Sequence, residues 1–233
     1  TGNHNSAFGS GTLVYNTNGD VNSSFGALSM TMNTTGDSNS AFGFHSLFSN
    51  TQGGSNSAFG IKALYSNTNG FNNCAFGLHS MQFNLIGAHN TAVGPYSLYN
   101  NISGGNNVAL GNSSMFNTTS GSNNIAIGTY ALYNNVPGNF NIAIGYQSGA
   151  NITGNNNIAI GYDAAIPLGL NNQVRIGNTS ITYAGIQVAW TITSDRRWKD
   201  NIKTVPLGLE FISKLNPVSY TRKNDEKKKT EYG

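Results

Sequence analysis

The stretch NIAIGTYALYNNVPGNFNIAIG, residues 124–145, begins and ends with the same five-residue motif, repeated after seventeen residues. A period this short means that each repeat is one small structural unit, which must stack on its neighbours to bury its apolar residues. The sequence therefore predicts a rod-shaped solenoid of stacked coils. The glycine that ends the motif recurs at intervals of seventeen and then sixteen residues, at Gly9, Gly26, Gly43, Gly60, Gly77, Gly94, Gly111, Gly128, Gly145, Gly161 and Gly177.

Each repeat places the same residue types at the same distance from its glycine. Asn stands four residues before the glycine in every repeat except the last, which has Gln173, and a large apolar residue stands directly before it. Ala occupies most of the positions between them. A short, alternating, partly β-branched segment bounded by Asn and Gly indicates one short strand per coil. We also expect the stacked Asn side chains to hydrogen-bond one another.

The residues one and three positions before the glycine share one face of this strand, and they change together. Ser6 accompanies Phe8, whereas Ile125 accompanies Ile127. This exchange keeps the volume of one layer roughly constant, as a close-packed interior demands. We therefore expect this face to point into the core. The Ala and Asn columns are expected on the opposite face, where small Ala would allow close approach of another chain.

A second segment follows each glycine and carries Leu or Met at its fourth position. Stretches such as KALYSN, residues 62–67, are too short to decide between a helical turn and a second strand. From Gly145 onward, Gly149 and Ala165 replace the Leu column, which predicts a narrower rod. At about 4.8 Å for each coil, the whole rod is roughly 50 Å long.

An aromatic column stands five residues after the glycine, at Phe48, Tyr65, Tyr99, Phe116 and Tyr133. If these rings are exposed, Tyr65, Tyr99 and Tyr133 are candidates for stacking on a glycan. If they are buried, they contribute to packing within the trimer. Repetition along the rod favours packing, because an exposed ladder of rings would form a large apolar patch.

Charged residues are rare in the repeats. Before Arg175 the charged residues are Asp20, Asp37, Lys62 and Asp163, so the positive excess in the net charge of +3 is due to the last sixty residues. A rod with so little charge argues against a nucleic-acid-binding surface. The sequence contains no run of eighteen apolar residues that would predict a membrane span.

Metal, cofactor and redox sites are not expected. His4, His45, His79 and His89 fall into two columns in which partners lie at least two coils apart, too far to share a metal within one chain. The single cysteine, Cys74, stands in the small-residue column of its strand and is expected to fill core space.

The repeated NxAIG motif with its trailing glycine resembles the head of trimeric autotransporter adhesins over roughly residues 1–177. This resemblance implies an all-β fold, a left-handed parallel β-roll of about eleven coils of 16–17 residues that assembles as a homotrimer. The present repeats are longer than the usual adhesin repeat, so the geometry of the second segment stays open.

The C-terminal segment has a different composition. Charge rises abruptly at SDRRWKDNI, residues 194–202, and is followed by an apolar-periodic stretch at 207–215 that predicts a short helix, then by NPVSY. We predict a separate α+β segment at 194–233, joined to the rod by a connecting strand or neck at 178–193. The stretch from Val174 to Val205 resembles the junction between a trimeric fibre and the intramolecular chaperone domain of phage endosialidases and tailspikes.

In that family the chaperone trimerises, guides folding of the fibre before it, and in many members cuts itself off. The resemblance implies Ser194 as nucleophile and Lys199 as general base, with cleavage between Thr193 and Ser194. A lysine can take the hydroxyl proton if burial lowers its pKa. An alternative role for Ser194 and Asp195 is to cap the segment that follows.

These patterns predict a structural and adhesive trimeric fibre module, located on a virion or otherwise outside the cell. The expected partners are two further copies of the chain, a host cell-surface glycan or protein, and upstream fibre or baseplate proteins. Three copies acting together would allow each contact to be weak. One alternative is a bacterial surface trimeric adhesin. Another is a serine autopeptidase that acts once in cis, with no external substrate.

Overall fold

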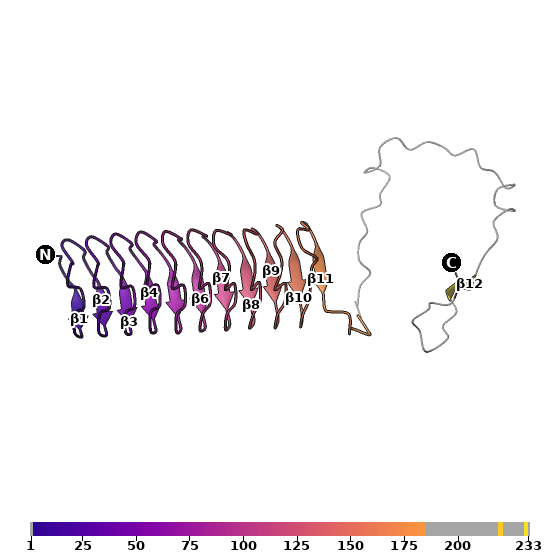
Figure 1. Ribbon diagram of the computed structural model, residues 1–233, viewed down its shortest axis with the longest axis horizontal. Coiled ribbons are helices and arrows are strands. Elements are labelled where there is room, and N and C mark those ends of the chain that lie inside the picture. The colour runs from indigo at the N-terminus through magenta and orange to yellow at the C-terminus, as the bar shows by residue number, and fades with distance from the viewer. Residues whose placement is uncertain (1, 185–218, 221–230, 233) are drawn as a thin grey trace, which may run out of the picture. The chain divides into compact units, whose positions relative to one another are not determined.

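The computed structural model describes residues 2–184, 219–220 and 231–232. The chain divides into two units, Thr1–Tyr183 and Ala184–Gly233, and each is described by itself. The first unit is a rod of stacked coils (Figure 1), each of which contributes one strand of three residues. The strands are β1 (Ser6–Phe8), β2 (Ser23–Phe25), β3 (Ser40–Phe42), β4 (Ser57–Phe59), β5 (Cys74–Phe76), β6 (Thr91–Val93), β7 (Val108–Leu110), β8 (Ile125–Ile127), β9 (Ile142–Ile144), β10 (Ile158–Ile160) and β11 (Val174–Ile176).

These eleven strands form one parallel sheet in sequence order. Each strand pairs with the next in register, so that Ala126 lies beside Ala143 and Ile127 beside Ile144. Residues 2–184 contain no helix. The predicted all-β parallel solenoid is therefore confirmed, with strands shorter than the four or five residues that the pattern indicated.

The expected orientation of the strand is wrong. The central Ala of each strand from β3 to β10 is fully buried, and it packs with the Leu or Met of the second segment in one continuous core. The residues on either side of it point outward, as shown by Ile125 and Ile127, which are 36% and 38% exposed. Because Leu and Met side chains already fill the narrow interior, a strand position that faces inward has room for little more than a methyl group.

The Asn column is also buried rather than exposed, and it forms the predicted ladder of amides. In one coil, the backbone N–H and the Nδ2 of Asn56 both donate to Oδ1 of Asn39, at 3.0 and 3.1 Å. The same Nδ2 donates to the carbonyl oxygen of Gly70 at 2.8 Å. The amide therefore satisfies backbone groups at a place where water has no access.

A second buried ladder, seven residues after each motif glycine, was not anticipated. Asn50 donates from Nδ2 to Oδ1 of Asn33 at 2.8 Å and to the carbonyl oxygen of Gly53 at 2.8 Å. Thr118 replaces Asn in this column, and the ladder stops there. The two ladders line the interior of the coil together with the apolar core.

The second segment is neither a strand nor a helical turn. Alternate residues adopt positive φ angles, 54° at Lys62 and 51° at Leu64. The backbone N–H of Lys62 donates to the carbonyl oxygen of Phe44 in the preceding coil, whereas the N–H of Leu64 donates to that of Ser80 in the next coil. These inter-coil hydrogen bonds compensate a conformation that is costly for residues with a side chain.

The motif glycines lie directly above one another. A Cβ atom on Gly60, whose φ is 137°, would lie 2.5 Å from the carbonyl oxygen of Gly77. The period that identifies the fold thus marks the place where successive backbones approach most closely.

The core continues past Gly149, where the Leu column ends. Ile152 replaces the Asn of the second ladder and is only 1% exposed. Its Cδ1 lies 2.6 Å from the position that a Cβ on Gly149 would occupy. An isoleucine from a neighbouring column therefore fills the space left by the missing leucine.

In the second unit, the described strands are β12 (Ser219–Tyr220) and β13 (Glu231–Tyr232), which pair antiparallel. The helix expected at 207–215 and most of the neck expected at 178–193 lie outside the described residues.

Candidate binding surfaces

The outward residues of the sheet form a row along the rod, here called the strand face, in which the third residue of every strand is apolar. It comprises the first and third residues of β1–β11. In the first coils it carries stacked rings, with centroid distances of 4.7 Å between Phe42 and Phe59 and 4.5 Å between Phe59 and Phe76. Further along it carries aliphatic side chains, such as Ile144 at 37% exposure. A continuous apolar row of this length is unusual on a monomer.

The co-variation seen in the sequence belongs to this outer face. Ser with Phe in the early coils and Ile with Ile in the later coils keep its thickness roughly constant. Cys74 occupies the same row on β5, where it is half-buried, so it does not fill the core as expected. Partial burial raises the pKa of its thiol.

The aromatic column of the second segment is half-buried and stacked. Tyr65 lies over Phe48 at a centroid distance of 5.2 Å, and Phe116 lies between Tyr99 and Tyr133 at 4.8 and 5.2 Å. One face of each tyrosine ring is therefore covered by a neighbouring ring. The structure brings Tyr99 and Tyr133 into one stack and leaves Tyr65 in another.

Gln82 separates the two stacks. It is 8% exposed, and Nδ1 of His79 donates a hydrogen bond to its Oε1. The aromatic residue of this coil stands one position later, at Phe83, which is 40% exposed. Phe83 meets the ring of Tyr99 edge-on, at 5.0 Å and 84°.

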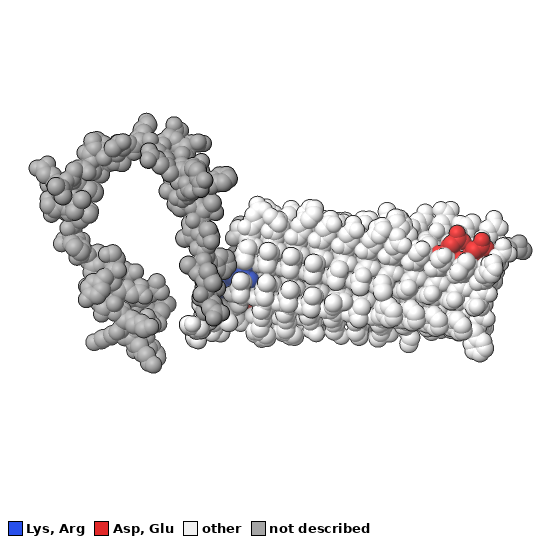
Figure 2. Space-filling view, turned by 180° about the vertical axis from the view of Figure 1, so that it is seen from behind, with Lys and Arg blue, Asp and Glu red and all other residues white. Residues whose placement is uncertain are grey.

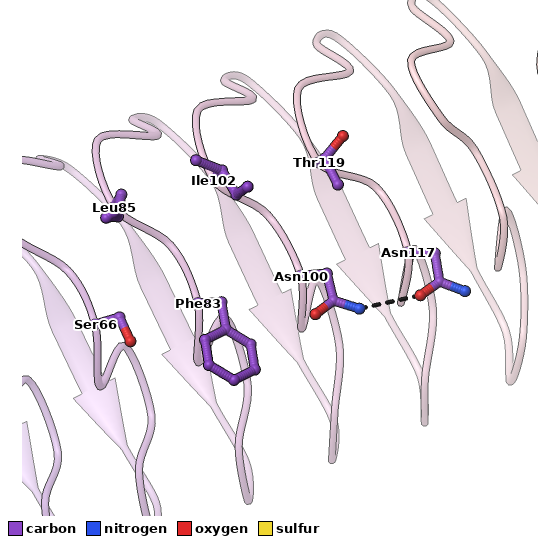
Figure 3. A pocket seen from close by; sticks show the side chains of 7 residues that line it. All are labelled: Ser66, Phe83, Leu85, Asn100, Ile102, Asn117 and Thr119. Atoms are coloured by element: carbon purple, nitrogen blue, oxygen red, sulfur yellow. Dashed lines mark hydrogen bonds between the residues drawn. The ribbon is translucent and has the colours of Figure 1, made fainter.

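A groove with a volume of about 520 Å³ lies beside Phe83. Figure 3 shows its two rows of side chains, which come from four successive coils. Sequence reasoning missed this groove. The one signal in the sequence was that the aromatic residue of this coil stands one position later than in its neighbours. The residues that surround Phe83 in the groove become known only from the fold. The groove is lined by Ser66, Phe83, Leu85, Asn100, Ile102, Asn117 and Thr119.

A smaller hollow, of about 270 Å³, lies beside Tyr133 and Tyr130. Its other lining residues include Asn134, Gln147 and Asn151. A row of amides connects the two hollows. Asn100 donates to Asn117, Asn117 to Asn134, and Asn134 to Asn151, at 3.0, 2.7 and 2.7 Å.

Asp20 and Asp37 are linked by a hydrogen bond. The backbone N–H of Asp20 donates to Oδ1 of Asp37 at 2.6 Å. Figure 2 shows the acidic patch near one end of a face that is otherwise mostly uncharged. Within the described ranges, no three residues among His, Cys, Asp and Glu are grouped as a metal site would require.

His45 has an unusual environment. Its ring stacks on Phe44 at 4.0 Å, and its Nδ1 is buried without a hydrogen-bond partner. Burial, and secondarily the nearby Lys62, lower the pKa of His45 below its usual value. Both effects favour the neutral imidazole.

The predicted cleavage residues, Ser194 and Lys199, lie outside the described residues, as does the bond between Thr193 and Ser194. Sequence comparison does reach this segment. Residues 194–233 match the family described as chaperone of endosialidase. The match covers the C-terminal segment alone, and it begins at the serine where the composition changes. No curated protein matches the chain.

The resemblance of the repeats to adhesin heads rests on the motif and on the parallel solenoid. The described residues contain no helix that is long and apolar enough to cross a membrane.

Proposed function

We propose that the chain is a module of a trimeric fibre, with the rod as its shaft and residues 194–233 as the start of an intramolecular chaperone. One observation carries this proposal. A segment that matches the chaperone of endosialidase follows a repetitive rod whose strand face is apolar and exposed. The proposed assembly is a tail fibre or receptor-binding fibre, on a virion or otherwise outside the cell.

The strand face supplies the contact between copies. If three copies are arranged around an axis parallel to the rods, each residue faces its own counterpart. Phe rings then meet Phe rings, and Ile side chains meet Ile side chains. The paired exchange of Ser–Phe for Ile–Ile keeps the volume around such an axis constant from coil to coil. The number three comes from the resemblance to trimeric fibres.

Charge substitutions on the strand face test this contact. Ile144→Asp would place three carboxylates around the axis and is expected to leave single chains in solution. Phe140→Asp is the matched control, because Phe140 is 60% exposed and lies outside the strands. Light scattering on the full chain gives the molar mass of each variant. Dissociation by both variants, or by neither, would argue against the strand face as the interface.

Self-cleavage is the second element of the proposal. Ser194 would give its hydroxyl proton to Lys199 and attack the carbonyl carbon of Thr193, and the peptide bond would break as the amine of Ser194 takes up a proton. Water would then hydrolyse the resulting ester and separate the two fragments. The parent chain should then yield a fragment ending at Thr193 in an intact-mass measurement. Ser194→Ala and Lys199→Ala should remain whole. An uncut parent would leave the segment as a permanent chaperone, with Ser194 in a capping role.

Adhesion to a host surface is the third element. Tyr65, Tyr99 and Tyr133 remain candidates for glycan contacts, through the ring faces and edges that their neighbours leave open. Three parallel copies would multiply a weak contact into firm attachment. We expect the labelled full chain to adsorb to cells. The Tyr133→Ala variant should lose this adsorption while keeping the molar mass of the parent assembly.

A further inference from the structure

The groove beside Phe83 exists because the repeat departs from its own pattern there. The column eight residues after the motif glycine is Thr17, Thr34, Thr51 and Thr68 in four successive coils, and then becomes Leu85 and Ile102. In the same region, an exposed Phe83 follows Ser66 in the column that lines the opposite wall. Each column also carries an apolar residue elsewhere, at Tyr15 and Met32 in one and at Val136 in the other. At this hollow, however, apolar side chains of both columns line one groove, which indicates a local binding role.

The walls of the groove offer the two kinds of contact that a sugar uses. Phe83, 40% exposed, provides an aromatic surface for the C–H groups of a sugar ring. Asn100 and Asn117 provide amides, and Ser66 and Thr119 provide hydroxyls. A site that is mostly apolar, with a few convergent polar groups, has the composition of a small-molecule site, and about 520 Å³ lies in the usual size range.

The row of amides leaves an acceptor beside the aromatic ring. Asn100 donates from Nδ2 to Asn117, and Figure 3 shows its oxygen on the side of Phe83. No group in the described part of the chain donates to this oxygen. At the other end of the row, Nδ2 of Asn151 makes no hydrogen bond to the described residues, and Asn151 is one of the residues that line the hollow at Tyr133. An acceptor and a donor thus stand at opposite ends of one line parallel to the rod.

The absence of charge selects among ligands. None of the residues that line the groove is charged. The one lysine of the rod, Lys62, lies instead over the ring of Tyr65, at 5.8 Å. A phosphate or carboxylate would be desolvated here without a counter-charge, which is unfavourable.

We propose that the groove binds a neutral oligosaccharide that lies along the rod, with one ring on Phe83 and hydroxyl groups donating to Asn100. Four successive coils line the groove, which makes it long enough for more than one sugar ring. This inference rests on the adhesive role proposed above and names its ligand class.

The test is binding of the full chain to an array of neutral linear oligosaccharides, with matched sialylated and uronic acid-containing ones beside them. We expect binding to neutral probes, reduced about tenfold or more by Phe83→Ala, the loss expected for a central contact. Phe83→Trp should retain binding. Phe71→Ala is the matched control, since Phe71 is 46% exposed and lies outside the groove.

Several results would overturn the inference. The first is that the chain binds no neutral probe, and the second is that it binds acidic probes alone. The third is that Phe83→Ala and Phe71→Ala reduce binding equally. A change in molar mass with Phe83→Ala would show that the groove is a contact between copies. Adsorption to cells that survives Phe83→Ala would refute the groove and leave the fibre proposal standing. A monomeric chain that adsorbs to no cells would instead refute the fibre proposal.

Discussion

Thr118 interrupts a ladder of buried asparagines directly after Asn101. Oδ1 of Asn101 and Oγ1 of Thr118 are both buried, and neither has a hydrogen-bond partner among the described residues. In the coils before them, the same position carries an amide that donates to the preceding one, as Asn101 itself donates to Asn84 at 2.7 Å. A buried polar atom without a partner destabilises the fold.

Thr118→Asn should therefore stabilise the rod. The new Nδ2 would reach Oδ1 of Asn101 and restore the ladder, for a gain of about 1 kcal/mol in the free energy of unfolding. Chemical denaturation followed by circular dichroism measures this change. Thr118→Val serves as the control, because it removes the hydroxyl but leaves Asn101 without a donor. Equal stability of the Asn and Val variants would contradict the explanation.

The corrected orientation of the strands leads to a second prediction, on adjacent residues of β8. Ala126→Leu adds volume to a filled core and should lower the free energy of unfolding by about 1–3 kcal/mol. Ile125→Leu, on the 36% exposed outer position, should change it by less than about 1 kcal/mol. The comparison is made on single chains, so that contacts between copies do not contribute. If Ile125→Leu lowered the free energy of unfolding more than Ala126→Leu, the assignment of Ala126 to the inner face of the strand would be wrong.

The glycine column gives a third prediction. A Cβ on Gly111 would lie 2.7 Å from the carbonyl carbon of Gly128, and the backbone there has a φ of 133°. Gly111→Ala should destabilise the rod by more than about 1 kcal/mol. Gly169→Ala is the comparison, because Gly169 also has a positive φ, of 75°, but has nothing within 4 Å of its Cβ position. A similar loss of stability at both sites would mean that the positive φ angle, rather than the contact between coils, causes the destabilisation.

His45 predicts a pH dependence of stability. Its pKa is lowered in the folded chain by burial and by Lys62, so the unfolded chain binds a proton more readily. Stability should be complete above the unfolded pKa of about 6.5 and decrease as the pH falls from there toward the folded pKa. His45→Gln should flatten this part of the profile. A loss that persists unchanged in this variant would point to another group.

The sequence was sufficient to predict the solenoid, its strands and the first amide ladder, because each follows from residues that recur at one spacing. It did not determine which face of the strand is inside. Ser–Phe and Ile–Ile conserve volume equally well in a core or in a contact between copies. The burial of Ala126 beside Leu132 shows that the second segment already fills the interior.

The groove could not be predicted for a different reason. Phe83, Asn100 and Asn117 are one repeat apart in the sequence and become neighbours only through the stacking of coils. Gln82 marks the break in the aromatic column, but it does not reveal that Leu85 and Ile102 form the opposite wall. The fold could be predicted because its residues repeat, whereas the groove depends on positions where the repeat changes.

The central claim is that copies of the rod lie parallel and in register along the strand face. Electron spin resonance can measure the distance between nitroxide labels on different copies of the full chain, in a Cys74→Ser background. Phe44→Cys and Tyr162→Cys place labels directly after a motif glycine near opposite ends of the rod, at residues that are 45% and 64% exposed. The account predicts a similar short distance at both positions. No dipolar coupling, or a short distance at one end and a long one at the other, would contradict it.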